Sequence, residues 1–198
     1  MLYSDVLHIA RPDDPERDRF VLSKGHANAA LAAVLAQAGF IEEDLLDRFY
    51  GYDSPLGMHP DIKVAGVEMS TGGLGHGLSV GIGMALGARL QGQDFRTCVM
   101  IGDGELQEGS NWEAAMAAAQ MGLSNLTAIV DYNKIQQGDR VEKTVDLDPL
   151  ADKWRAFGWA VREIDGHDMA EVVDALDSLP LVPDKPSMLI AHTIKGKG

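Results

Sequence analysis

The sequence predicts an α/β protein built on a parallel β-sheet. Short apolar runs, often β-branched, alternate along the chain with longer segments of helical periodicity, which is the order expected of strand–helix–strand units. The clearest unit runs from Thr97 to Asp131 and has the length of one right-handed crossover. The chain has 198 residues, 45% of them apolar, so we expect residues 1–198 to bury one core and form a single domain.

The first predicted helix covers residues 26–38, HANAALAAVLAQA, and follows a turn at residues 23–25. Gly39 comes directly after it, in the position where a glycine in the left-handed conformation terminates many helices. Residues 47–68 contain several glycines and prolines and show no periodicity, so they predict a long surface excursion. Loops of this length are often functional.

Residues 70–90 predict a second helix, although they contain many glycines. A glycine inside a helix costs about 1 kcal/mol relative to alanine, so repeated use needs a reason. Close approach of another backbone is the usual one, and we expect it here. The glycines concerned are Gly77, Gly81, Gly83 and Gly87.

The central unit begins with a predicted strand, residues 97–101, and an acidic loop. Ser110 and Glu113 have the spacing of a capping box, so they predict the start of a helix that runs to Met121 and ends at Gly122. Its expected apolar face consists of Trp112, Ala115, Met116 and Ala119.

A strand over residues 126–131 completes the central unit. Beyond it, the pattern predicts a helix over 149–157, a strand over 159–164, a helix from Met169 with Val172, Val173 and Leu176 on its apolar face, and a strand over 187–192.

Charge and cysteine content exclude several classes of function. The formal net charge is −13, with 30 acidic against 17 basic side chains, so we expect neither nucleic acid nor a membrane as partner. Cys98 is the one cysteine and lies in a predicted strand, which fits a reducing compartment. Without a signal-like start or a long apolar run, the sequence favours a cytoplasmic protein.

The acidic loop IGDGELQEG predicts a ligand site. Asp103 follows the first central strand and Asn133 follows the second, and the carboxyl ends of parallel strands meet at one edge of a sheet. Carboxylate, amide and main-chain oxygens are ligands that Mg²⁺ or Ca²⁺ prefers, and diphosphate oxygens would complete such a site. The alternative is that Asp103-Gly104 forms an ordinary turn and Asn133 an ordinary strand exit.

Six collinear motifs carry a resemblance to a known family. The segment GDGELQEGSNWEA, with Asn133 after it, resembles the signature of thiamine-diphosphate enzymes in its transketolase form. The other motifs lie in the expected order and cover nearly the whole chain. They are DRFVLSKGHA (18–27), GMHPD (57–61), VEMSTGGLGHGLSVGIGMALG (67–87), IDGHD (164–168) and DKPS (184–187).

The resemblance implies a set of cofactor ligands. It implies Asp103, Asn133 and the main-chain oxygen of Ile135 as ligands of Mg²⁺, with Ca²⁺ or Mn²⁺ as substitutes. Gly104 and Asn133 would also touch thiamine diphosphate, and His26 would contact its phosphate end. The backbone of Gly72, Gly73 and Leu74 would meet the cofactor as well, and Gly73 replaces the proline usual in large single-chain transketolases.

The resemblance also implies residues for substrate and assembly. His59 matches a histidine that handles the substrate, and Glu108 matches a glutamate of a carboxylate network between the two cofactors at the subunit interface. Taken alone, each could be structural or solvated. We leave His76, His167 and His192 as structural residues, and Glu105 has no expected role beyond its charge.

The implied reaction is transfer of a two-carbon ketol unit from a ketose, or its phosphate, to an aldose. In this family a glutamate of a second, pyrimidine-binding domain activates the cofactor, and we expect it on a separate C-terminal transketolase subunit, in an α2β2 assembly. One alternative is another thiamine-diphosphate enzyme of the same fold, acting on an unusual sugar or biosynthetic intermediate. A nicotinamide-binding domain is a further alternative, because Gly75, Gly77 and Gly81 spell G-x-G-x-x-x-G.

Overall fold

Five parallel strands form the central sheet of the protein, as the sequence predicts. The structure is a computed structural model that describes residues 6–9 and 11–197. The order across the sheet is β1-β2-β3-β7-β6, and all four neighbouring pairs are parallel. The strands are β1 (Arg19–Leu22), β2 (Thr97–Gly102), β3 (Leu126–Tyr132), β6 (Ala160–Asp165) and β7 (Ser187–His192).

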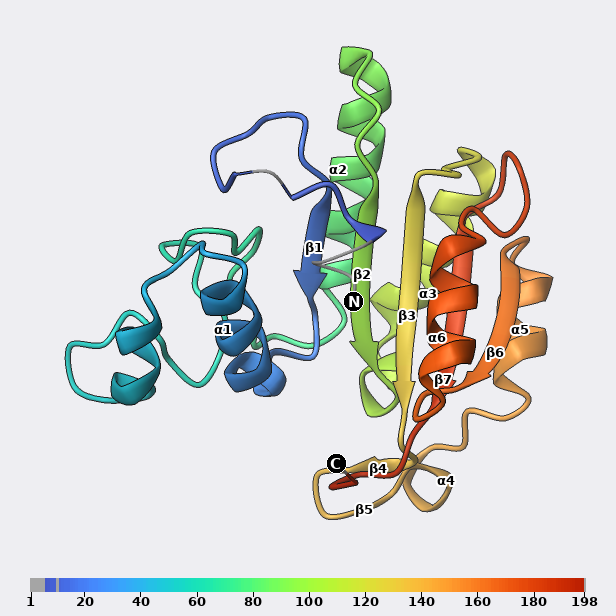
Figure 1. The fold of residues 1–198 in the computed structure, drawn as a ribbon. Helices are drawn as coiled ribbons and strands as arrows, with labels where there is room; N and C mark the ends of the chain where they lie inside the picture. Colours follow the sequence, from blue (N-terminus) through green and yellow to red (C-terminus); the bar gives the residue numbers. More distant parts are fainter. Residues whose placement is uncertain (1–5, 10, 198) are drawn as a thin grey trace.

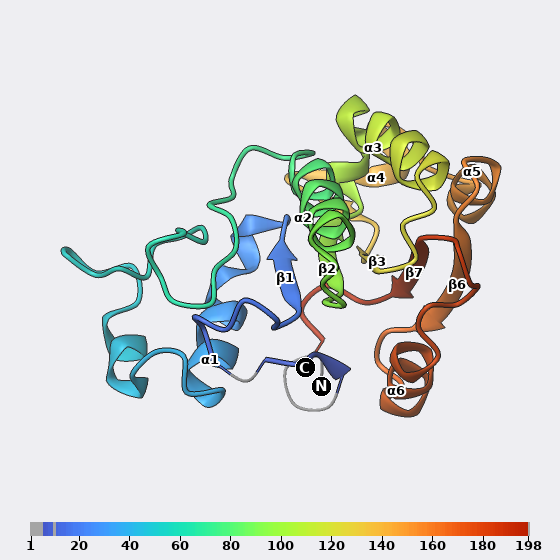
Figure 2. The same ribbon diagram turned by 90° about the horizontal axis from the view of Figure 1, so that it is seen from above.

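Helices cover both faces of this sheet. In Figure 2, α2, α3 and α5 lie on one side of the strands, and α1 and α6 lie on the other. Their bounds are α1 (Asn28–Gln37), α2 (Gly77–Gln91), α3 (Gly109–Gln120), α5 (Leu150–Ala156) and α6 (Met169–Asp177). Short 3-10 turns occur at Gly25–Ala27, Glu43–Arg48 and Gly104–Gln107. Among the described residues, no helix is long and apolar enough to cross a membrane.

The carboxyl ends of the strands form the lower edge of the molecule in Figure 1. The hairpin of β4 (Ile135–Gln136) and β5 (Asp139–Arg140) lies there, with the short helix α4 (Val141–Thr144) and the last described residues. The excursion that follows α1 extends to the side of the sheet, beyond β1 (Figure 1). This edge therefore gathers the loops that follow β2 and β3.

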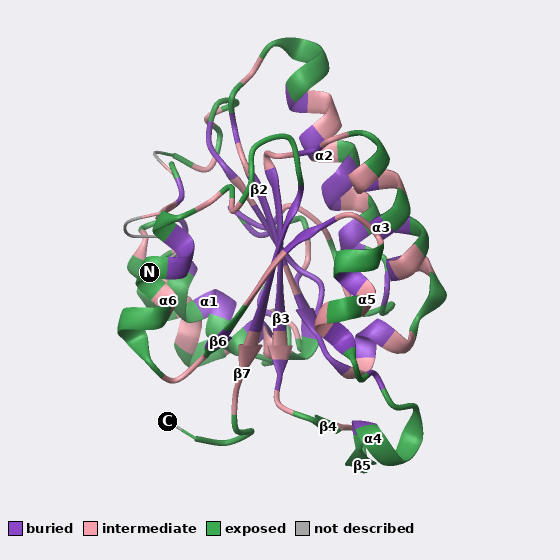
Figure 3. Cartoon of the chain, turned by 90° about the vertical axis from the view of Figure 1, so that its right-hand side faces the viewer, coloured by how far each residue is buried: buried purple, intermediate pink, exposed green. Residues whose placement is uncertain are grey.

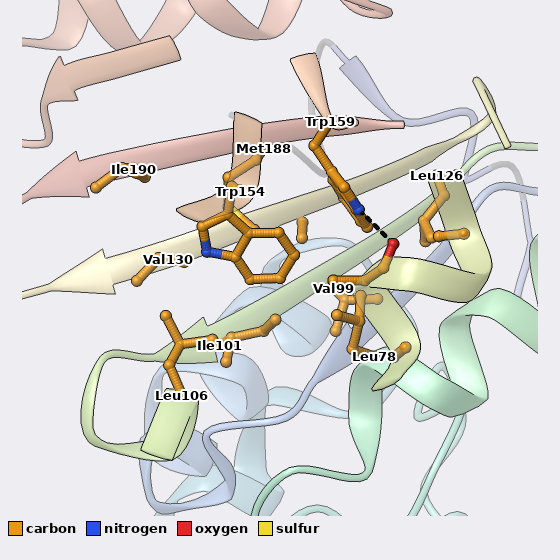
Figure 4. Close-up of a cluster of buried hydrophobic side chains, with 14 of the residues drawn as sticks. Leu78, Val99, Ile101, Leu106, Leu126, Val130, Trp154, Trp159, Met188 and Ile190 are labelled. Carbon is orange, nitrogen blue, oxygen red and sulfur yellow. Dashed lines mark hydrogen bonds between the residues drawn. The ribbon is translucent and has the colours of Figure 1, made fainter. Parts of the chain in front are cut away.

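The main core lies between the sheet and the helices α2, α3 and α5. Figure 4 shows Trp154 and Trp159 packed among aliphatic side chains from β2, β3 and β7, and the indole N–H of Trp159 donates to the Ala115 carbonyl at 2.9 Å. Trp154 and Leu106 are completely buried. Because Leu106 comes from the turn after β2, this core also anchors that turn.

The opposite face of the sheet is covered in two separate patches, one beneath α1 and one beneath α6. A cavity of about 280 Å³ lies on this face. Its lining is almost wholly apolar and includes Met100, Ile129 and Leu189 from three neighbouring strands, and Leu176 from α6. In Figure 3 the strands are the most continuously buried part of the chain, whereas the helices are buried only along one side.

Most predicted elements are confirmed within a few residues, but the sequence does not predict β1, which has only four residues and begins with an arginine. The expected close approach to the glycines of α2 is confirmed at Gly77 and Gly81, where an added Cβ would lie 2.3 Å from the Ser23 hydroxyl and 2.5 Å from a Val99 methyl group. The expectation is wrong at Gly83, which has no such neighbour within 4 Å. The same holds for Gly87, where the nearest such atom is the flexible end of Gln91 at 3.8 Å.

The predicted capping box of α3 is wrong. The helix begins at Gly109 with Glu108 as N-cap, and Ser110 lies inside it, where its hydroxyl donates to the Gly75 carbonyl at 2.8 Å. The predicted apolar face is also rotated, since Ala114 and Ala118 are buried whereas Met116 is 53% exposed. Likewise Val173 of α6 is exposed, and Ala175 takes its predicted place in the core.

Candidate active site

The loops after β2 and β3 meet at the carboxyl edge of the sheet, as the spacing predicts. Gly102, the last residue of β2, pairs with Asp131 of β3, so Asp103 lies next to the segment that follows Tyr132. The carboxylate of Asp103 is buried and accepts hydrogen bonds from the backbone N–H groups of Gly104, at 2.7 Å, and Lys134. It therefore ties the two loops together directly.

Asp103 and Asn133 have the donor chemistry of a site for a hard cation. Burial raises the pKa of Asp103, and the charge of Asp131 acts in the same direction, while hydrogen bonds from Gly104 and Lys134 oppose them. A divalent cation would offset that desolvation. The side-chain oxygen of Asn133 accepts from the N–H of Ile135 at 3.0 Å, which folds this loop back beside Asp103.

Oxygen lone pairs are still available at this position. A carboxylate oxygen has two lone-pair sites, and each oxygen of Asp103 accepts one hydrogen bond. Within residues 6–9 and 11–197, no group of three or more His, Cys, Asp and Glu side chains could hold a metal ion. A cation here would therefore need Asn133 and main-chain oxygens besides Asp103, which is the donor set preferred by Mg²⁺.

Asp131 lies behind Asn133 and fixes its orientation. Its carboxylate accepts from the ammonium group of Lys24, from the hydroxyl of Thr193, and from the Asn133 amide at 3.2 Å. Burial alone would raise the pKa of Asp131, but the hydrogen bonds from Lys24 and Thr193 hold it below its ordinary value. The sequence does not single out Asp131 or Lys24, because their pairing joins segments that are far apart in the chain.

The two predicted histidines approach the same edge from different segments. Burial, followed by the positive charges of Lys24 and Lys195, lowers the pKa of His26. His59 packs against the backbone of the turn before His26: a Cβ added to Gly25 would lie 2.8 Å from the His59 ring, and one added to Gly72 would lie 3.6 Å from it. A larger residue at position 25 would push this histidine away.

The loop at residues 72–74 presents its backbone next to these histidines. All three residues are exposed, and Gly72 has a φ of 147° that favours glycine. The ring of His76 binds back to the Leu74 carbonyl through Nδ1 at 2.9 Å, which gives this histidine a structural role, as expected. Similarly, His167 accepts from the N–H of Ile194 at 2.8 Å.

The two glutamates of the acidic loop have opposite environments. Glu108 is exposed at the start of α3, where a partner could reach it. Glu105 is 3% exposed, and its carboxylate accepts hydrogen bonds from Ser23, Gly75 and Gly102. The expectation that Glu105 contributes only charge is therefore wrong, since its side chain joins three segments of the site.

Comparison with known proteins identifies the family. The whole chain, residues 1–198, matches the family described as "Transketolase, thiamine diphosphate binding domain". The chain belongs to the transketolase family. One of two curated subunits of an apulose-4-phosphate transketolase type, from Phocaeicola vulgatus, is 45% identical over 199 residues, which cover all of this chain and 71% of that protein.

Other transketolases are similar as well. A 6-deoxy-6-sulfo-D-fructose transketolase subunit from Clostridium sp. is 46% identical over 188 residues, 94% of this chain and 68% of that protein. The crystal structure of transketolase from Campylobacter jejuni superimposes with a TM-score of 0.90 at 32% identity and covers 97% of this chain and 32% of that chain.

Membership of the transketolase family rules out the nicotinamide alternative. The glycines that suggested it, at 75, 77 and 81, lie at the start of α2, and no strand leads directly into them within the described part of the chain. Gly77 and Gly81 instead allow close packing of α2 against Ser23 and Val99. Their spacing therefore reflects helix packing, not nucleotide binding.

Proposed function

We propose that residues 1–198 form one domain, the diphosphate-binding half of a two-component transketolase dependent on thiamine diphosphate and Mg²⁺. The reaction is transfer of a two-carbon ketol unit from a ketose or its phosphate to an aldose or its phosphate. The observation that carries the proposal is the buried Asp103 at the end of β2, linked to the Asn133 loop, in a transketolase thiamine-diphosphate domain. A cytoplasmic location belongs to the same proposal.

Asp103, Asn133 and the main-chain oxygen of Ile135 would hold the cation, and Ca²⁺ or Mn²⁺ would serve in place of Mg²⁺. Gly104 and Asn133 would also touch the diphosphate, alongside the backbone of Gly72, Gly73 and Leu74. When bound, thiamine diphosphate supplies the nucleophilic carbon and the electron sink that cleavage of a ketose carbon–carbon bond requires.

The histidines would act on the phosphate and on the substrate. His26 lies close to Lys24 and Lys195, so this corner of the site concentrates positive charge suited to a phosphate group. His59, packed against Gly25 and Gly72, would hydrogen-bond substrate hydroxyls and exchange protons with them near neutral pH.

A second chain would complete the active site. The names of two relatives describe them as transketolase subunits, which supports a separate C-terminal, pyrimidine-binding partner carrying the activating glutamate. The simplest arrangement is an α2β2 assembly. Glu108 is exposed at the start of α3, where it could enter a carboxylate network at the subunit interface.

An unusual sugar is the second candidate for the substrate. The names of the same relatives refer to apulose 4-phosphate and 6-deoxy-6-sulfo-D-fructose, neither of which is a common hexose or pentose phosphate. This favours a thiamine-diphosphate enzyme with the same chemistry and a different sugar specificity.

A ketol-transfer assay tests the proposal. This chain would be assayed alone, with a candidate C-terminal subunit, and with both proteins plus EDTA, against a panel of ketose donors and aldose acceptors. Activity should require both chains and should disappear with EDTA. The variant Glu108→Gln should lower it, while Glu113→Gln, an exposed glutamate on α3, should not. Full activity of this chain alone would overturn the two-component proposal.

A further inference from the structure

The buried carboxylate of Glu105 joins three segments that are far apart in the sequence. One oxygen accepts from the hydroxyl of Ser23 and from the N–H of Gly75, the latter at 2.9 Å, and the other accepts from the N–H of Gly102 at 3.1 Å. These partners lie 82, 30 and 3 positions away in the chain. Glu105 thus connects the turn before His26, the loop after Leu74 and the end of β2.

Gly75 is held on both sides of its peptide backbone. Its N–H donates to Glu105, and its carbonyl accepts from the hydroxyl of Ser110 at 2.8 Å. Its φ of 82° lies in the left-handed region, and an added Cβ would lie 2.6 Å from the Glu108 Cβ and from the Ser110 hydroxyl. The backbone at this position therefore has one conformation and one place against α3.

The residues next to these anchors are those assigned to the cofactor. Leu74 precedes Gly75, and Asp103 follows Gly102, so each anchored group is one peptide unit from a proposed ligand. We propose that Glu105 is a positioning residue that holds the 72–74 loop at the correct distance from Asp103 for thiamine diphosphate to bind both. This inference rests on the proposed function.

The geometry requires a carboxylate at this position. Three donors converge on two oxygens, and both oxygens are used. A glutamine has one acceptor oxygen, and its NH₂ group would face either the N–H of Gly102 or the pair formed by Ser23 and Gly75. The hydroxyl of Ser23 already accepts from the N–H of Gly77 at 3.2 Å, so it has little capacity to adapt. Glu105→Gln therefore keeps the shape but leaves a buried donor without its acceptor.

The test is the dissociation constant of thiamine diphosphate, measured by calorimetric titration at saturating Mg²⁺ with the chain assembled with its partner subunit. Substitutions of residues that orient ligands commonly weaken binding by about 10- to 100-fold, and we expect a loss of this size for Glu105→Gln. Glu113→Gln, on the exposed side of α3, is the matched control and should bind as the wild type does. Unchanged affinity in Glu105→Gln would overturn the inference.

A second variant separates positioning from folding. Ser110→Ala removes only the hydrogen bond to the Gly75 carbonyl, and it should weaken cofactor binding by about 2- to 10-fold, the range expected for one hydrogen bond. Near-UV circular dichroism and the cofactor-free melting temperature establish that each variant is folded. If Glu105→Gln does not fold, Ser110→Ala decides alone, and wild-type affinity in it would overturn the inference.

The same titration distinguishes failure of the inference from failure of the proposed function. If the wild-type assembly does not bind thiamine diphosphate in the presence of Mg²⁺, the proposed function fails and the inference fails with it. If the wild type binds and both variants bind equally well, only the role of Glu105 is refuted.

Discussion

The two faces of the sheet are packed in different ways. The face beneath α2, α3 and α5, the closed face, has one continuous core, which includes Leu106 from the turn that carries Asp103 and Glu105. The face beneath α1 and α6, the open face, has two smaller clusters and a cavity of about 280 Å³. Trp112 donates to the Leu106 carbonyl at 2.9 Å and packs against Trp154, so the cofactor loop is anchored from the closed face.

Matched leucine substitutions give the largest expected difference between the faces. Leu106 is completely buried in the closed core, whereas Leu176 borders the cavity on the open face. The cost of a Leu→Ala substitution depends on how many neighbours the side chain loses, so Leu106→Ala should lower the free energy of unfolding by about 4–5 kcal/mol and Leu176→Ala by about 2–3 kcal/mol. Urea denaturation of the cofactor-free chain measures both. Equal costs would remove the distinction between the faces.

The reactivity of Cys98 examines the open face where α1 covers it. The thiol is 3% exposed in the cluster beneath α1, and burial raises its pKa to about 12. Its thiolate fraction at neutral pH should be about 1000-fold lower than that of an exposed cysteine, so a thiol-specific reagent should modify it only in denaturant. Rapid labelling of the native protein would show that α1 does not seal this part of the sheet.

The smallest expected effect is at His26, at the edge where the site lies. Burial and the charges of Lys24 and Lys195 lower its pKa, so its NMR titration should have a midpoint below the ordinary value of about 6.5. The unfolded chain then binds a proton more readily than the native one, and this group reduces stability as the pH falls below about 6.5 towards the native pKa. His26→Gln should flatten that pH dependence. A midpoint above 6.5 would contradict this electrostatic account.

The parts of the site that depend on one crossover can be predicted from the sequence. Asp103 and Asn133 meet because β2 and β3 are parallel neighbours, and both strands are apolar enough to be recognised. The role of Glu105 could not be predicted, because its partners Ser23 and Gly75 come from loops with no periodic signal. Hydrogen bonds between distant loops depend on tertiary packing and leave no pattern in the local sequence.

Local rules fail where tertiary contacts take over a side chain. Ser110 has the spacing of a capping residue, but its hydroxyl donates to the Gly75 carbonyl, and Glu108 takes the N-cap position. The strand β1 escapes prediction because four residues, one of them a charged Arg19 half-buried at its start, carry too little periodicity. Both features are evident only once the loops are placed beside the sheet.

Binding of thiamine diphosphate tests the central claim most directly. Calorimetric titration of the chain assembled with its partner subunit should show saturable binding in the presence of Mg²⁺ and none in EDTA. Asp103→Asn, which keeps the shape but removes the charge, should abolish binding, whereas Asp152→Asn on the exposed side of α5 should bind like the wild type. Equal, Mg²⁺-dependent binding by Asp103→Asn and the wild type would contradict the assignment of Asp103 and the site built around it.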